Sequence, residues 1–170
     1  RLFWVGAVNM QGRTHIVFGF LLSSIFWFIF HLPGDVVLMA WIGSILPDLD
    51  YRWREVRWVT HRRTLHNIWA MTLSTLAISL TLWYLKEHYT LLPPMINPWL
   101  LGVFFALGFL FHLLLDSTTK TGVMWLYPVK KSLYWKGPIT TGSIVEKVIQ
   151  TLIIISILAI VVFPRIRLPT

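Results

Sequence analysis

Five apolar runs separated by short polar segments divide the sequence, and their lengths predict helices that enter or cross a membrane. A helix rises 1.5 Å per residue, so about 20 apolar residues are needed to cross a hydrocarbon core of about 30 Å. The second run is short and reaches only about 16 Å at that rise. The expected spans are residues 16–30, 36–46, 67–85, 99–115 and 144–163.

Composition agrees with this pattern. Hydrophobic residues make up 56% of the 170 residues and charged residues only 13%, which lies outside the range of ordinary soluble proteins. We therefore expect an all-α, polytopic integral membrane bundle of about five spans, folded as one domain over residues 1–170. The polar segment 117–142 carries Trp and Tyr residues suited to the lipid headgroup layer, so we expect an interfacial loop there.

The alternating direction of the spans sorts the polar residues into two groups. If the first span leads away from His15, the second returns to Asp48, the third departs from His66, and the fourth returns to His112. Candidate site residues therefore gather at one end: His15, Asp48, Asp50, His61, His66, His112 and Asp116. The remaining histidines, His31 and His88, fall at the opposite end, and we expect them to have structural roles only. We expect the same of Glu87 and Glu146.

The residue types at the shared end suit a metal ion. The chain has no Cys, so a metal must be held by His, carboxylate and water. His112 and Asp116 are four residues apart on one helix face and could bind one ion together. Asp48 and Asp50 follow Pro47, which interrupts regular helix and allows both carboxylates to point inward. A bound cation would also offset the unfavourable position of acidic residues at helix C-termini.

At these positions the sequence resembles the YdjM-type membrane-bound metal-dependent hydrolases, over most of its length. The matching motifs are Thr14-His15 with Gly19, Leu46-Pro47-Asp48-Leu49-Asp50, His61-Arg62 with His66, and His112-Leu-Leu-Leu-Asp116-Ser117 with Gly122. That family is distantly similar to zinc-dependent phospholipases C and single-strand-specific zinc nucleases. The resemblance implies a hydrolase with a divalent metal site; we expect one to three ions, zinc first and manganese as the alternative.

The expected function is hydrolysis of a phosphate ester in a lipid or lipid-linked substrate at the membrane interface. Asp50 is expected to bridge ions or act as a base, and Arg62 and Arg63 to hold phosphate in a fork geometry that Lys cannot match. The expected partners are membrane lipid and an anionic lipid or lipid-linked phosphate, because the formal charge is +8. No stable nucleic-acid partner is expected.

Two other classes remain open. One is a small metal or proton transporter whose His and Asp residues line a pathway, which predicts ligands at the middle of the membrane. The other is a non-catalytic scaffold whose metal site only fastens helices together. A Ser-hydrolase Gly-x-Ser-x-Gly motif and a zinc-protease His-Glu-x-x-His motif are both absent from the sequence.

The charge distribution predicts the orientation. On this topology twelve of the fifteen Lys and Arg residues lie at the site end, leaving only Lys86, Arg165 and Arg167 at the other. Basic loops stay preferentially on the cytoplasmic side. We therefore expect an integral protein of the cell membrane with its site facing the cytoplasm.

Overall fold

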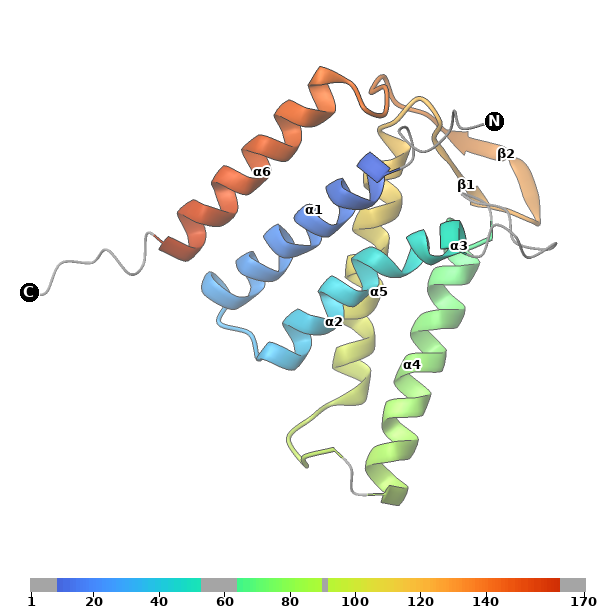
Figure 1. The fold of residues 1–170 in the computed structure, drawn as a ribbon. Helices are drawn as coiled ribbons and strands as arrows, with labels where there is room; N and C mark the ends of the chain where they lie inside the picture. Colours follow the sequence, from blue (N-terminus) through green and yellow to red (C-terminus); the bar gives the residue numbers. More distant parts are fainter. Residues whose placement is uncertain (1–8, 53–63, 90–91, 163–170) are drawn as a thin grey trace, which may run out of the picture.

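The computed structural model describes residues 9–52, 64–89 and 92–162, and the chain within these ranges is mainly helical (Figure 1). The elements in chain order are α1 (Asn9–Phe28), α2 (Gly34–Ile45), the 3₁₀ turn η1 (Leu46–Asp48), α3 (Leu49–Arg52), α4 (Ile68–Tyr89), α5 (Pro98–Ser117), β1 (Val123–Leu126), β2 (Lys130–Trp135) and α6 (Ile144–Val162).

The helices confirm the expected membrane bundle. Among the described residues, α4, α5 and α6 are each long and apolar enough to cross a membrane, and α1 contains a shorter apolar helix over Arg13–Phe28. The second run is the short element, as predicted, because α2 has 12 residues and rises about 18 Å. Its end is continued by η1 and α3, which carry Asp48 and Asp50.

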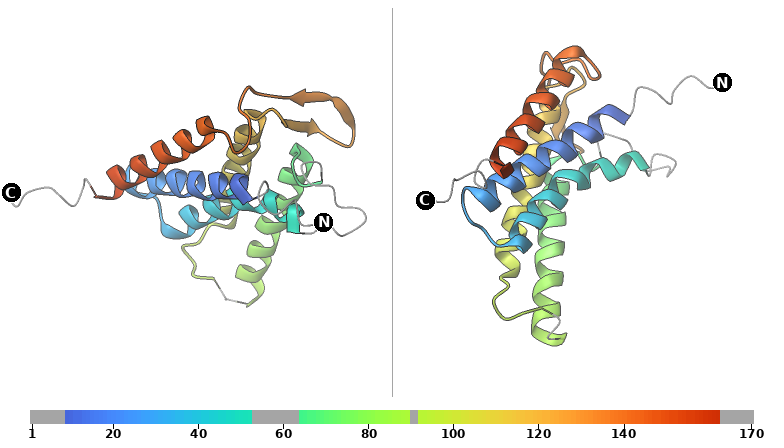
Figure 2. Two further views of the ribbon diagram at one scale, coloured as in Figure 1. Left: turned by 45° about the horizontal axis from the view of Figure 1, so that its top comes forward. Right: turned by 60° about the vertical axis from the view of Figure 1, so that its left-hand side comes forward.

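The helices form two groups that cross each other. Helices α6, α1 and α2 lie side by side, and α5 crosses behind α2 and packs beside α4 (Figures 1 and 2). In the most apolar stretch of α5 44% of the residues are buried, against 6% in α4 and 11% in α6. Helix α5 is therefore central, and α4 and α6 present apolar side chains to the lipid.

Two glycines allow α2 and α5 to cross at close range. A Cβ added at Gly43 would clash with the backbone carbonyl of Phe105, and a Cβ added at Gly108 would clash with that of Ala40. Small residues at such a crossing let two membrane helices approach backbone to backbone. The crossing brings the C-terminal part of α2 against the half of α5 that carries His112.

The region predicted to be an interfacial loop contains a β-hairpin instead. Strands β1 and β2 pair antiparallel, with Val123 opposite Trp135 and Met124 opposite Tyr134. β-branched and aromatic residues favour pleated, half-buried backbone, and these lie on both sides of the turn at Pro128. Val123 is fully buried and completes a core cluster with Phe105, Phe109 and Leu113 of α5, so the hairpin is anchored beside the end of α5.

Candidate metal centre

The C-terminal turns of α5 supply two buried polar side chains. His112 and Asp116 are each 1% exposed, and His112 Nε2 lies 3.7 Å from Asp116 Oδ2. The four-residue spacing therefore places both groups on one face, as the sequence predicted. Their face of the helix is turned toward α1, the end of α2 and the segment before α4.

A backbone carbonyl fixes the orientation of His112. Its Nδ1 donates a hydrogen bond to the carbonyl oxygen of Ser44 at 2.7 Å. A carbonyl can only accept, so the proton lies on Nδ1 and the lone pair lies on Nε2. Ser44 is the residue after Gly43, so the close crossing of α2 and α5 is what brings this carbonyl within reach. His112 is thus held with Nε2 ready to bind a cation.

A carboxylate orients His66 in the same way. His66 Nδ1 donates to Asp50 Oδ2 at 3.0 Å, and both side chains are fully buried. The next residue, Asn67, caps α4 because its Oδ1 accepts from the backbone N–H of Ala70 at 2.8 Å. This cap fixes where α4 begins and therefore where His66 lies. A histidine held by a carboxylate at one ring nitrogen is the usual arrangement of a metal-binding histidine.

Three donor atoms face one another in front of these two rings, and a fourth, from Asp48, lies beside both histidines. His66 Nε2 lies 3.1 Å from His112 Nε2 and 3.2 Å from Asp116 Oδ2. Asp48 Oδ1 lies 3.8 Å from both Nε2 atoms. Ligands that each lie 2.0–2.1 Å from a tetrahedral zinc ion are about 3.4 Å apart. The separations among His66, His112 and Asp116, from 3.1 to 3.7 Å, bracket that value, so these three donors fit one divalent ion.

His15 joins this cluster from α1. Its Nε2 lies 3.2 Å from Asp116 Oδ1, and its ring stacks on that of His112 with centroids 3.7 Å apart. His15, Asp48 and His112 also form a second group whose donor atoms lie close enough to share an ion. Asp116 therefore faces His15 with one oxygen and His66 with the other. His15 Nδ1 is buried and has no hydrogen-bond partner in the described part of the chain.

The electrostatics of the cluster favour a positive charge. Burial lowers the pKa of His66, but its hydrogen bonds to Asp116 and Asp50 and the charges of these two carboxylates raise it to about 9. Buried carboxylates are costly unless a cation balances them. Asp50 and Asp116 are at most 1% exposed, and a proton on His66 provides only part of that balance. A divalent ion would provide more.

The structure brings five of the predicted ligands together: His15, Asp48, His66, His112 and Asp116. Asp50 has a different contact from the predicted one, because it lies behind His66 and is in neither group of converging donors. His61, Arg62 and Arg63 lie outside the described residues. The other two histidines, His31 after α1 and His88 near the end of α4, lie at the opposite ends of their helices.

Glu146, for which we expect a structural role from the sequence, is buried beside the site. It is 6% exposed, and its Oε1 accepts from Thr14 Oγ1 at 2.6 Å. It lines a cavity of about 40 Å³ together with His15 and Asp116. A local signal exists, because Ser143-Ile-Val-Glu146 has the spacing of a capping box at the start of a helix. That signal predicts the helix start but not the contact with α1.

Apolar helices that surround a buried cluster of His and Asp define an integral membrane protein with a candidate metal site. The chain matches the family described as YdjM inner membrane protein over residues 10–168, and it belongs to that family. This match confirms the resemblance at the family level. Comparison with the curated proteins and with the solved structures gave no significant match.

Proposed function

We propose that this protein is a metal-dependent hydrolase of a phosphate ester in a lipid or lipid-linked substrate at the membrane interface. The observation that carries the proposal is the convergence of two imidazole Nε2 atoms and two carboxylate oxygens at one end of the bundle. When bound, a divalent ion supplies Lewis acidity, which polarises a phosphoryl oxygen and makes water a better nucleophile at neutral pH.

The protein's own residues prepare this site. Ser44 and Asp50 keep the protons of His112 and His66 on Nδ1, so that both Nε2 atoms face the ion position. His15 can donate from Nε2 to Asp116, which leaves its unpartnered Nδ1 as an unprotonated nitrogen. That nitrogen can accept a proton. Asp50 acts here through His66 rather than on the substrate.

The solvent exposure of the site supports a catalytic metal site rather than a purely structural one. The side chains of His66, His112 and Asp116 are at most 2% exposed, whereas that of Asp48 is 21% exposed. A substrate would therefore approach from the Asp48 side. Structural metal sites are closed, and catalytic ones keep a position open to solvent or substrate.

The basic segment suggests how an anionic substrate would be held. Arg62 and Arg63 come four and three residues before His66, so the chain between them can span at most about 14 Å. Their guanidinium groups can bind phosphate through two parallel hydrogen bonds. We propose that they contact the phosphate, with the site on the cytoplasmic side where anionic lipids are abundant.

The test is a hydrolysis assay on purified protein in detergent micelles with zinc or manganese. Phospholipids and polyprenyl phosphates should release phosphate or a phosphorylated headgroup. A chelator or His112→Ala should abolish turnover, and His88→Ala should leave it unchanged. Turnover of single-stranded nucleic acid alone would overturn the lipid substrate. No turnover at full metal occupancy would instead support a scaffold whose metal fastens the helices.

A further inference from the structure

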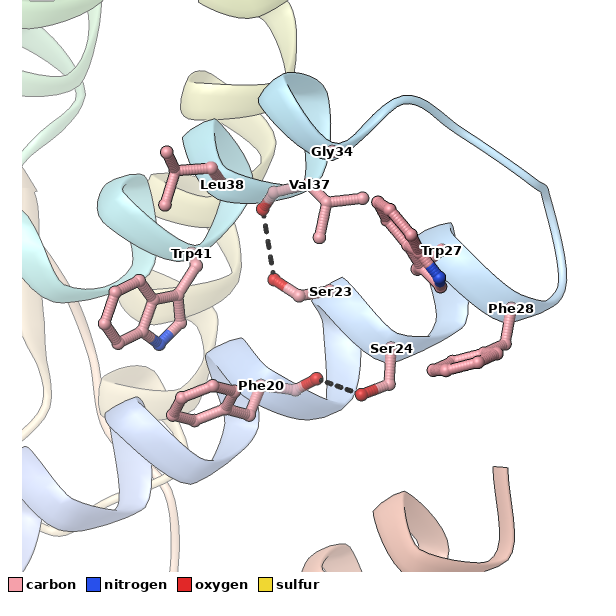
Figure 3. A pocket seen from close by; sticks show the side chains of 9 residues that line it. All are labelled: Phe20, Ser23, Ser24, Trp27, Phe28, Gly34, Val37, Leu38 and Trp41. Carbon is pink, nitrogen blue, oxygen red and sulfur yellow. Dashed lines mark hydrogen bonds between the residues drawn. The ribbon is translucent and has the colours of Figure 1, made fainter. Parts of the chain in front are cut away.

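A groove runs along the outside of the bundle between α1 and α2. It has a volume of about 370 Å³, and Figure 3 shows its side chains from close by. Its walls are mainly apolar: Phe20, Trp27 and Phe28 come from α1, and Val37, Leu38 and Trp41 come from α2.

The two serines in the groove offer little to a polar ligand. Ser23 Oγ donates to the backbone carbonyl of Val37 at 3.2 Å, and Ser24 Oγ donates to that of Phe20 at 2.8 Å (Figure 3). Both hydroxyl protons are therefore used by backbone oxygens within the two helices. What remains is an apolar surface, which favours hydrocarbon.

The groove begins close to the metal centre and leads away from it. Trp41 lies one turn before Ser44, whose carbonyl holds His112. At the far end the ring of Trp27 lies beside Gly34, where α2 begins. From Phe20 to Phe28 the groove follows two turns of α1, or about 12 Å.

We propose that this groove binds one hydrocarbon chain of a membrane lipid, with the lipid's polar end directed toward the metal centre. Trp27 and Leu38 are each 48% exposed, so the groove is open to lipid along its side. A helix is about 10–12 Å across, and even three turns of one occupy several times the volume of the groove. Part of a single hydrocarbon chain is narrow enough to lie along it, and burying that part against aromatic rings is favourable.

The idea that the bound lipid is also the substrate rests on the proposed function. The idea that the groove binds a hydrocarbon chain rests on the groove alone. The first test therefore needs no turnover. Purified protein is placed in phosphatidylcholine nanodiscs that contain phosphatidylglycerol with a photoreactive diazirine in one acyl chain. After irradiation, labelled residues are mapped by mass spectrometry. Groove residues should be labelled several-fold more than Leu152 and Leu158 of α6, which are each 57% exposed.

Two variants fill the groove from opposite walls, Ser24→Phe on α1 and Val37→Phe on α2. Either should reduce groove labelling several-fold. The matched control is Ser156→Phe on α6, because Ser156 is exposed and its hydroxyl likewise bonds the carbonyl four residues before it, at 2.8 Å. The proposal would be overturned if labelling followed side-chain exposure alone, so that groove residues were labelled no more than Leu152 and Leu158. It would also be overturned if both filling variants left groove labelling unchanged. The thermal unfolding temperature is measured in each variant to confirm that the fold is retained.

A second measurement connects the groove to hydrolysis. The filling variants should raise KM for long-chain substrate several-fold and leave hydrolysis of a short-chain soluble analogue unchanged. Suppose that wild-type protein hydrolyses both the long-chain substrate and the short-chain analogue. If the filling variants then change hydrolysis of the two substrates equally, the groove does not hold the substrate chain. If no lipid is hydrolysed at all, the proposed function fails, and the labelling result still decides whether the groove binds a chain.

Discussion

Asp50 Oδ2 lies 3.0 Å from His66 Nδ1, and neither side chain reaches the surface. This contact makes Asp50 the group that orients His66, a candidate metal ligand, whereas its sequence position suggested a bridging ligand or a base. A negatively charged acceptor also makes the opposite ring nitrogen a stronger donor.

Asp50→Asn should therefore weaken metal binding without abolishing it. The amide oxygen can still accept from His66 Nδ1 but carries no charge, and such changes typically cost 10–100-fold in metal affinity. Titration against a chelating dye measures this. Asp35→Asn, in the first turn of α2 at the far end of the helix, is the control. If the variant instead bound one metal ion fewer per protein, Asp50 would be a direct ligand.

The close crossing of α2 and α5 gives a second prediction. Gly108→Ala should push the helices apart, because the new Cβ would clash with the carbonyl of Ala40. We expect the free energy of unfolding in detergent to fall by about 1–3 kcal/mol. We also expect metal affinity to fall, because Ser44 would move away from His112. Gly34→Ala is the control, because its Cβ would meet only the ring of Trp27. Equal effects of the two substitutions would argue against the crossing as a support of the site.

The contact between α1 and α6 gives a third prediction. Thr14 Oγ1 donates to Glu146 and accepts from Gln150 Nε2, so it connects the two helices beside His15. Thr14→Val keeps the shape but removes both bonds, and a hydrogen bond contributes about 0.5–1.5 kcal/mol, or about 1.5–3 kcal/mol where one partner is charged. Thermal unfolding with chelator present should occur at lower temperature. Thr72→Val should have little effect, because the Thr72 hydroxyl bonds only its own helix. A change no larger than in this control would contradict the role given to Thr14.

Orientation in the membrane is a fourth prediction, and the absence of Cys allows it to be tested without background. Lys120→Cys lies at the site end beside the hairpin, and Glu87→Cys lies near the far end of α4. An impermeant thiol reagent added to intact cells should label Glu87→Cys and leave Lys120→Cys unlabelled until the membrane is opened. The reverse pattern would place the site outside.

Sequence reasoning reached the parts of the site that depend on helix direction and spacing. His112 and Asp116 could be paired because helical periodicity fixes their relative direction. Asp48 and His66 could be assigned to the same end because consecutive spans alternate in direction. These inferences need only the order of the spans, which an apolar pattern of this strength defines.

The remainder depends on tertiary packing that a single sequence does not encode locally. Whether Asp50 faces an ion or His66 depends on the turn of α3 relative to the start of α4. The contact of Glu146 with Thr14 depends on α6 lying beside α1, although the two are far apart in sequence. The hairpin was missed because its short strands lie in a polar segment without clear alternation.

The most direct test of the account is the metal content and coordination of the purified protein. Wild-type protein should retain a divalent ion through chelator-free purification. X-ray absorption at the metal edge should show two imidazole ligands together with oxygen ligands at about 2.0–2.1 Å if the metal is zinc. His112→Ala and Asp116→Ala should lose the metal, and His31→Ala and His88→Ala should retain it. A wild-type metal content in the His112 and Asp116 variants, or a spectrum without imidazole, would contradict the metal centre described here.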